Sequence, residues 1–373
     1  MNENQNPGLY LHVPFCRSKC PYCSFYSVPS TKLVPQWLRA LQREVSLYRE
    51  RFGRFDTIYL GGGTPTLLGT RDLAEIMDCL YAHFDFTTET ETTIEANPCD
   101  LTPDKIRELK TLGFNRVSLG VQSFDDRTLS FLGRRHTALE AERALGDLRA
   151  LGFENIGVDL IYGCNGQTMK DWTDTLTRAL SFQPEHLSCY QLTIEKGTHF
   201  HGRVGLGKIR PLSEREGYDF FMRTSRLLED HGYIHYEVSN FAKVNTYISR
   251  HNRKYWHHTP YLGLGPCAHS FSESTRWWNV RSVRGYCDMI EGGRPPVEGL
   301  ERLTDQQMLL ESISLGSRTT GGFDLSLIPS NPHSSERLMR LQEDGFLRLS
   351  NGRVLPTRKG FLVADHLPLY LLD

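Results

Sequence analysis

Residues 9–27 read LYLHVPFCRSKCPYCSFYS, a short apolar run followed by a loop that carries three closely spaced cysteines. The spacing C-x3-C-x2-C of Cys16, Cys20 and Cys23 lets three thiolates converge from one loop on one metal centre. Thiolates select zinc, copper(I) or an iron–sulfur cluster. Structural zinc and ordinary low-potential clusters take four protein ligands, so three cysteines predict a cluster with one iron left open. A zinc loop with a distant fourth ligand, or cysteines close together by chance, are the alternatives.

Further short apolar runs follow LYLHV, and each is rich in Val, Ile, Leu or Tyr, as in strands buried on both faces. They begin at Thr57, Thr93, Arg116, Ile156 and Leu187. Amphipathic stretches lie between them, and one of these has Thr102 as its N-cap and Pro103 at its first position. Six strands that alternate with helices predict a parallel α/β sheet, closed or partly closed into a barrel, with ligands at the carboxyl ends of the strands.

The alternation ends after about Thr198, and the later sequence has a different organisation. An aromatic, histidine-rich stretch spans residues 251–278. From Thr304 onward, two helical stretches, a hairpin with the turn Asn351-Gly352 and a last apolar helix over 360–372 predict a small winged-helix-like α+β domain. The expected units are a core barrel with its cysteine loop over 1–200, a connecting segment over 201–300 and a C-terminal domain over 301–373.

The amino-acid composition does not indicate a particular partner, and it argues against two kinds of binding surface. The 373 residues are 39% hydrophobic and 23% charged, which is ordinary for a globular protein. A formal net charge of -1 argues against a general nucleic-acid or anionic-membrane surface. The N-terminus MNENQNPG lacks a signal pattern, and no apolar stretch reaches the length of a membrane span, so we expect a cytoplasmic protein.

Glycines and polar residues stand at the ends of the predicted strands. The second strand runs into a glycine turn, Gly61-Gly62-Gly63-Thr64, whose bare backbone can approach a ligand closely. Glu95 and Asp159 lie inside apolar strand runs, where a carboxylate is costly unless it has a partner or a ligand. Each alone could be a satisfied structural carboxylate, but several on successive strands favour a shared site.

Taken together, the motifs of this chain resemble those of one known family, and the resemblance covers nearly the whole chain. CRSKCPYC, YLGGGTPT, TIEANP, GFNRVSLGVQSF, LGRRHT, VDLIYG and PEHLSCYQLT strongly resemble the radical S-adenosylmethionine (SAM) proteins related to oxygen-independent coproporphyrinogen III dehydrogenase. The resemblance implies a partial (β/α)6 barrel, a [4Fe-4S] cluster on the three cysteines, and SAM that chelates the fourth iron. Position by position, it implies contacts with the cluster or SAM for Tyr10, Tyr22, Gly62, Gly63, Thr64, Glu95, Gln122, Arg134 and Asp159, the last as a ribose partner.

Two features separate the chain from the dehydrogenase. Phe25 stands where that enzyme has a further cysteine in its cluster loop. The run His251-Asn252-Arg253-Lys254-Tyr255-Trp256 resembles the HN-x-x-YW stretch of HemW-type haem chaperones, which bind finished haem and hand it over. His251 is therefore a candidate ligand of haem iron. A hydrogen-bonded structural role for His251 stays open, and the rival ligands are His257, His258 and His269.

The expected function is that of a haem chaperone with a [4Fe-4S] cluster, SAM and haem as its cofactors. The expected partners are haem and an acceptor protein, with no nucleic acid, and peripheral contact with membrane-bound acceptors is left open. The alternative is a radical enzyme of the coproporphyrinogen III dehydrogenase type, in which cleavage of SAM yields a radical that abstracts a substrate hydrogen. Whether the chain is an enzyme is therefore open. A structural zinc protein is a more distant third interpretation.

Overall fold

A computed structural model describes residues 6–372, and a twelve-stranded sheet in the order β12-β11-β10-β9-β1-β2-β3-β4-β5-β6-β8-β7 runs through most of it. Its centre is six parallel strands, each paired with the next along the chain. These are β1 (Gly8–Val13), β2 (Phe55–Gly62), β3 (Phe86–Ala96), β4 (Arg116–Gln122), β5 (Ile156–Tyr162) and β6 (His186–Gln191). All six predicted strands and their parallel arrangement are confirmed.

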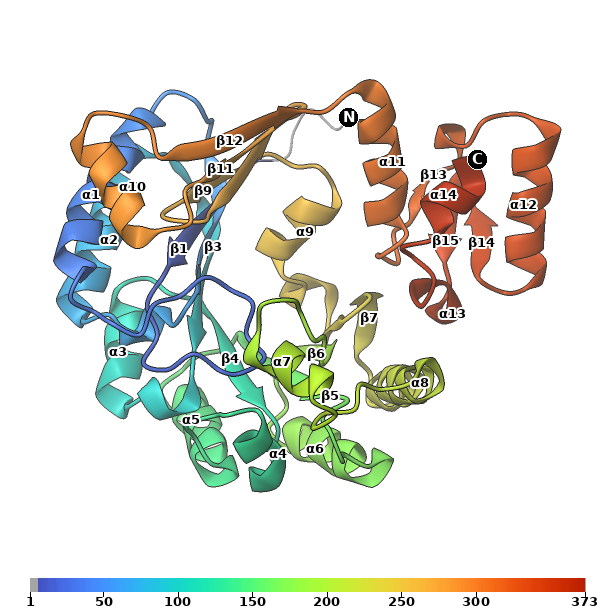
Figure 1. Cartoon of the computed structure of the whole chain (residues 1–373), viewed down its shortest axis with the longest axis horizontal. Coiled ribbons are helices and arrows are strands. Elements are labelled where there is room, and N and C mark those ends of the chain that lie inside the picture. The colour runs from blue at the N-terminus through green and yellow to red at the C-terminus, as the bar shows by residue number, and fades with distance from the viewer. Residues whose placement is uncertain (1–5, 373) are drawn as a thin grey trace.

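Helices connect the parallel strands and lie along the outer side of the curved sheet (Figure 1). They are α1 (Val34–Leu47), α2 (Thr70–His83), α3 (Pro103–Thr111), α4 (Asp126–Phe131), α5 (Ala138–Ala150) and α6 (Met169–Ser181). The predicted cap of α3 is present, because the Thr102 side chain accepts a hydrogen bond from the amide of Lys105. Between residues 6 and 372, no helix combines the length and the apolar character that a membrane crossing needs.

The sheet continues past the six central strands on both sides and stays open. β9 (Tyr261–Leu264) joins β1 in parallel, and β10 (His269–Ser272), β11 (Thr275–Asn279) and β12 (Val297–Arg302) extend that edge in antiparallel order. β8 (Asn240–Ala242) and β7 (Ile234–Glu237) extend the other edge. The barrel is therefore partial. The helices of this part are α7 (His199–Gly205), α8 (Glu214–Asp230), α9 (Arg250–Trp256) and α10 (Val283–Glu291).

The connecting segment shares its hydrophobic core with the barrel. Phe220 of α8, Leu262 of β9 and Trp277 of β11 belong to the same buried cluster as the central strands. The boundary at residue 200 stays a prediction, but it does not separate two hydrophobic cores.

The last part of the chain has a core of its own. It consists of α11 (Asp305–Gly316), β13 (Phe323–Asp324), α12 (Pro332–Glu343), β14 (Leu347–Ser350), β15 (Arg353–Pro356), α13 (Arg358–Phe361) and α14 (Leu367–Leu372). β14 and β15 form the predicted hairpin, with positive φ of 50° at Asn351 and 72° at Gly352. The single last helix expected over 360–372 is wrong: two short helices are present. Pro368 cannot donate a backbone hydrogen bond within a helix, so a new helix begins beside it.

A buried carboxyl group ties the first helix to this late edge of the sheet. Glu44 of α1 is 0% exposed and accepts hydrogen bonds from the Gly265 amide at 2.8 Å and the Tyr286 hydroxyl at 2.6 Å. Its other oxygen accepts from the Asn279 side-chain amide at 2.5 Å. Burial raises the pKa of Glu44 to about 7. The segments that contain Gly265, Asn279 and Tyr286 are therefore all bound to one side chain of α1.

Replacing Glu44 with alanine leaves these three donors buried and without their acceptor. We expect Glu44→Ala to lower the free energy of unfolding by about 3 kcal/mol, measured by urea titration. Glu44→Gln is the matched control, because it keeps one acceptor oxygen and should lose less. Equal stability of the alanine variant and the parent chain would contradict the role given to this group.

Candidate functional site

A cavity of about 480 Å³ opens at the carboxyl ends of the central strands. This volume is in the range that holds one ligand of drug-like size. Its lining includes most of the residues that the sequence singled out, namely Tyr22, Cys23, Gly62, Gly63, Thr64, Glu95, Gln122, Arg134 and Asp159. The structure therefore brings together residues from the cysteine loop and from five successive parts of the barrel.

The glycine turn after β2 packs directly against the cysteine loop. The Gly63 amide donates to the Val13 carbonyl at 2.8 Å, and the Thr64 amide donates to the Phe15 carbonyl at 2.7 Å. A Cβ at Gly63 would lie 2.4 Å from the Phe15 carbonyl oxygen, so no side chain fits there. Gly62 has a φ of +106°, which favours glycine. The turn thus supplies one wall of the cavity and holds the start of the loop.

Glu95 lies on the floor of the cavity with both carboxylate oxygens engaged. Oε1 accepts from the Tyr59 hydroxyl at 2.9 Å, and Oε2 accepts from the Gly62 amide at 3.0 Å. Burial, together with the nearby Asp159 carboxylate, raises the pKa of Glu95 to about 7 although the hydrogen bonds from Tyr59 and Gly62 oppose the shift. These contacts fix the position of a carboxyl group that is costly to ionise without a cation.

Asp159 is a second, half-buried acid of the same cavity. It accepts from the Ser118 hydroxyl at 2.9 Å, and burial raises its pKa. Strand register explains the grouping: Ser118 is paired with Glu95 across β3 and β4, and Ser188 with Asp159 across β5 and β6. Two half-buried acids with raised pKa values that lie in one cavity are suited to a cationic ligand with hydroxyl groups.

Arg134 connects the cavity with the cysteine loop. One guanidinium nitrogen donates to the Gly120 carbonyl at 2.7 Å and also to the side chain of Asn97. Another lies 3.7 Å from Cys20 Sγ and 3.5 Å from the Tyr22 hydroxyl. Its Nε is buried and has no hydrogen-bond partner in the described chain. This arrangement places a guanidinium cation beside one thiol of the cysteine loop and joins that loop to the cavity wall.

The three cysteines occupy one loop at the edge of the cavity. Cys16 is buried with Sγ 3.2 Å from the Ser27 hydroxyl, and Cys23 faces the cavity. Within residues 6–372, no three His, Cys, Asp or Glu side chains surround a point that would hold a single metal ion. In a four-iron cluster each thiolate binds a different iron, so the predicted ligand set of Cys16, Cys20 and Cys23 stays a prediction. Burial raises the pKa of Cys23, so metal ligation there must displace a proton.

Tyr10 and His251 lie outside the cavity lining. The Tyr10 hydroxyl donates to His12 Nδ1 at 3.1 Å, and His12 Nε2 is 2.9 Å from the Tyr26 carbonyl, so Tyr10 reaches the cysteine loop through His12. His251 is 1% exposed, with Nδ1 2.8 Å from the Thr57 hydroxyl and Nε2 2.9 Å from the Tyr255 hydroxyl. In this conformation neither nitrogen is available to haem iron. These contacts agree with the hydrogen-bonded role that the sequence left open, and the assignment of His251 as a haem ligand stays a prediction.

The rival histidines differ in accessibility. His258 is engaged with the Glu311 carboxylate at 3.2 Å. His257 and His269 are exposed, and among the described residues neither ring makes a hydrogen bond. His269 pairs across β10 and β11 with Trp278, and the two rings are stacked with centroids 5.9 Å apart. The accessible imidazoles therefore lie outside α9, on either side of β9 in the sequence.

Sequence reasoning missed several residues of the cavity. Tyr59, Asn97, Ser118 and Tyr190 also line it. Alternate residues of a strand face the same side, and this periodicity could have identified two of them. Tyr59 precedes the glycine turn by two positions, and Asn97 follows Glu95 by two. Ser118 and Tyr190 carry no comparable mark, since only the strand register brings them to the site.

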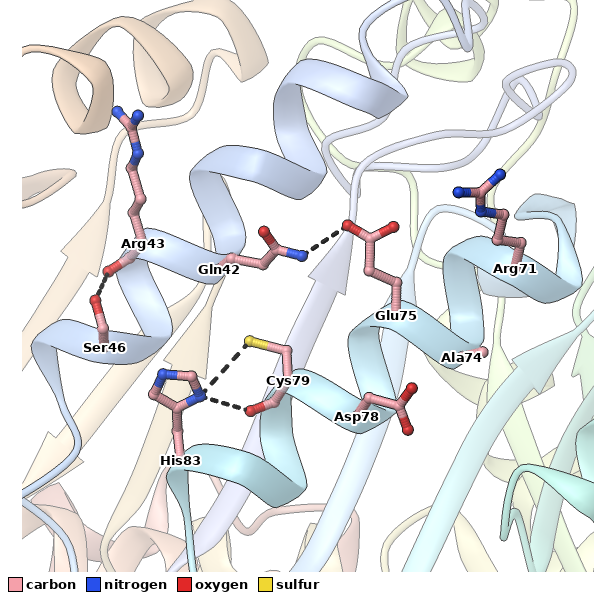
Figure 2. A pocket seen from close by; sticks show the side chains of 9 residues that line it. All are labelled: Gln42, Arg43, Ser46, Arg71, Ala74, Glu75, Asp78, Cys79 and His83. Carbon is pink, nitrogen blue, oxygen red and sulfur yellow. Dashed lines mark hydrogen bonds between the residues drawn. The ribbon is translucent and has the colours of Figure 1, made fainter.

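A second groove lies on the helical layer, away from these residues. It measures about 780 Å³ and is lined only by side chains of α1 and α2, among them Gln42, Glu75 and Cys79 (Figure 2). The Gln42 amide donates to Glu75 at 2.6 Å, and His83 bonds with the Cys79 carbonyl at 2.9 Å. Its larger volume does not make it the better site, because none of the predicted ligand-binding residues reaches it.

Comparison with known proteins agrees with this geometry. The family model described as Radical SAM superfamily matches residues 10–179, the part that holds the cysteine loop and β1 to β5. In structure, the chain is similar to coproporphyrinogen III oxidase (HemN) from Escherichia coli, with a TM-score of 0.85 and 23% identity, over 98% of this chain and 90% of that one. This likeness shows the fold. The protein is thus of the radical SAM class.

Whole-length relatives define the family more narrowly. The chain is 35% identical to "Heme chaperone HemW" of Bacillus subtilis (strain 168), over 96% of this chain and 97% of that protein. It is 34% identical to the protein of the same name from Mycobacterium tuberculosis (strain CDC 1551 / Oshkosh), over 96% and 93%. The chain belongs to the HemW family.

The raised pKa of Glu95 makes a pH-dependent prediction for the cavity. Because the carboxyl is protonated below a pKa of about 7, its attraction for a cationic ligand, for which SAM serves as the probe, should be present above pH 7 and be lost as the pH falls. We expect SAM affinity, measured by equilibrium dialysis, to fall by up to about tenfold per pH unit below pH 7. In Glu95→Gln this part of the pH dependence should disappear. A profile unchanged by that substitution would show that another group governs binding.

Proposed function

We propose that this protein is a haem chaperone that carries a [4Fe-4S] cluster and SAM, binds haem and transfers it to an acceptor protein. The observation that carries the proposal is the cavity in which two half-buried acids, Glu95 and Asp159, adjoin a three-cysteine loop. Membership of a family whose curated members are named heme chaperones supports the haem part.

The residues present fit the cluster and SAM. The loop offers three thiols and no fourth cysteine, because Phe25 occupies the position two residues after Cys23. When bound, such a cluster supplies electrons and one iron open to the amino and carboxylate groups of SAM. Glu95 would attract the positive charge of SAM, Asp159 would accept from ribose hydroxyls, and the turn Gly62–Thr64 would receive the methionyl part. Arg134 would hold the loop and the cavity wall together.

Haem needs a separate place, because a cavity of about 480 Å³ suits one ligand of the size of SAM and not SAM with a tetrapyrrole. We assign the axial ligand to His269. His269 is accessible to solvent. The protein atoms around it and the nearby Arg276 lower its pKa, which favours the neutral imidazole that binds iron. The Trp278 ring beside it offers an aromatic face to a porphyrin.

Transfer requires an acceptor, which the sequence leaves unnamed. The unit over residues 301–373 carries none of the cofactor residues and has its own core, so it is the part we propose for acceptor contact. A cytoplasmic location and peripheral contact with membrane-bound acceptors belong to the same proposal.

The cluster can be tested on its thiolates. In anaerobically reconstituted protein, Cys23→Ser should lose most of the bound iron and sulfide and the visible absorbance of the cluster. Cys79→Ser is the control, because Cys79 lies on α2 in the second groove, away from the cysteine loop, and should leave the iron content unchanged. A colourless parent protein that binds zinc would refute the cluster and favour the structural zinc alternative.

The haem site can be tested by titration of the reconstituted protein with saturating SAM, followed by Soret difference absorbance. We expect saturable binding that His269→Ala weakens by about tenfold or more, because the iron loses its axial ligand. His251→Ala and His257→Ala should bind as the parent does. Loss of binding only in His251→Ala would return the ligand role to α9. Efficient conversion of coproporphyrinogen III to protoporphyrinogen IX would sink the chaperone proposal in favour of the dehydrogenase-type enzyme.

A further inference from the structure

The helix α9, which carries His251, borders one end of the cavity. Its first turn is held by the buried carboxylate of Glu91 on β3, which accepts from the amides of Arg250 at 3.0 Å and His251 at 3.2 Å. Ser249 and Asn252, on either side, line the cavity itself. Glu91 precedes Glu95 by four residues on β3, so α9 is attached to the same strand that carries Glu95 into the cavity.

The ring of His251 supports the ring of Tyr59. The two are stacked with centroids 5.1 Å apart and planes inclined by 29°. Tyr10 packs beside both, 6.1 Å from Tyr59 and 6.3 Å from His251. Hydrogen bonds to Thr57 and Tyr255 hold the imidazole at both nitrogens, so its orientation is determined by β2 and α9 together. Because interiors are close-packed, a missing ring here would leave Tyr59 free to tilt.

Tyr59 in turn supplies one of the two hydrogen bonds that fix Glu95. A continuous line of contacts therefore runs from His251 through Tyr59 to the acid that faces the ligand. We propose that His251 is a positioning residue of the SAM pocket, which acts through Tyr59 to hold Glu95 in place. This inference rests on the proposed binding of SAM, and it gives the HN-x-x-YW segment a role at the SAM pocket that is distinct from haem ligation.

The arrangement explains why a histidine suits this position. The side chain must present a flat face to Tyr59 and also satisfy two buried hydroxyl groups, those of Thr57 and Tyr255. Phenylalanine would keep the face and lose the hydrogen bonds. Alanine would lose both. Comparing the two variants separates support of Tyr59 from general stability.

The experiment is SAM binding to anaerobically reconstituted full-length protein, measured by equilibrium dialysis across a pH series. We expect His251→Ala and Tyr59→Phe each to weaken SAM binding by about tenfold. His251→Phe should bind SAM within about twofold of the parent although it unfolds more readily. Because the Tyr59 hydrogen bond lowers the pKa of Glu95, its loss should move the midpoint of the pH profile upward in Tyr59→Phe and His251→Ala alike.

The double variant tests the route. If His251 acts through Tyr59, then His251→Ala with Tyr59→Phe should bind SAM about as weakly as either single variant. Independent losses that multiply, or a pH midpoint that stays at its parent value in His251→Ala, would overturn the inference. Failure of the parent protein to bind SAM at all would instead overturn the proposed function. Should His251→Ala not fold, His251→Leu gives the same comparison, because it fills space without a flat ring.

Discussion

The approach of Gly63 to the Phe15 carbonyl is the constraint on which the rest of the site depends. With a Cβ only 2.4 Å from that oxygen, any other residue would push the glycine turn away from the cysteine loop. The hydrogen bonds from Gly63 and Thr64 to the end of β1 would then be lost. Because the same turn donates to Glu95, the geometry of the loop and that of the cavity floor are set by one backbone contact.

The cavity holds a charge arrangement that is unfavourable until a ligand arrives. Glu95 and Asp159 are half-buried near each other, and each has a raised pKa, so the folded chain bears an electrostatic cost there. Arg116 and Arg134 lower the pKa of Asp159, but burial outweighs them. A cation with hydroxyl groups would relieve this cost. Binding and local stability are coupled in this way.

The histidine-rich segment illustrates how neighbours in sequence acquire different roles. His251 points into the protein, where Thr57, Tyr59 and Tyr255 surround it. His269, beyond β9, is an exposed residue at the start of β10, beside Trp278 of β11. One motif thus packs against the floor of the cavity, and the strands that follow it carry the histidine proposed as the haem ligand. If both proposals hold, the two ligands are kept apart while β9 and β1 connect their sites in one sheet.

The sequence by itself determined the six strands, the cap at Thr102 and the hairpin turn at Asn351-Gly352, because these depend on local periodicity and turn chemistry. Polar residues at the ends of successive strands, together with the resemblance of the motifs, indicated a shared site, and most of those residues line the cavity. Only the tertiary structure decided which side chains face one another across distant segments. The burial of His251, the bonds of Glu44 to three late segments and the pairing of β9 with β1 each join residues more than 190 positions apart. The physical reason is that local propensity carries no information about partners that are distant in the sequence. Such partners are decided only when the chain folds and early and late segments meet in one sheet.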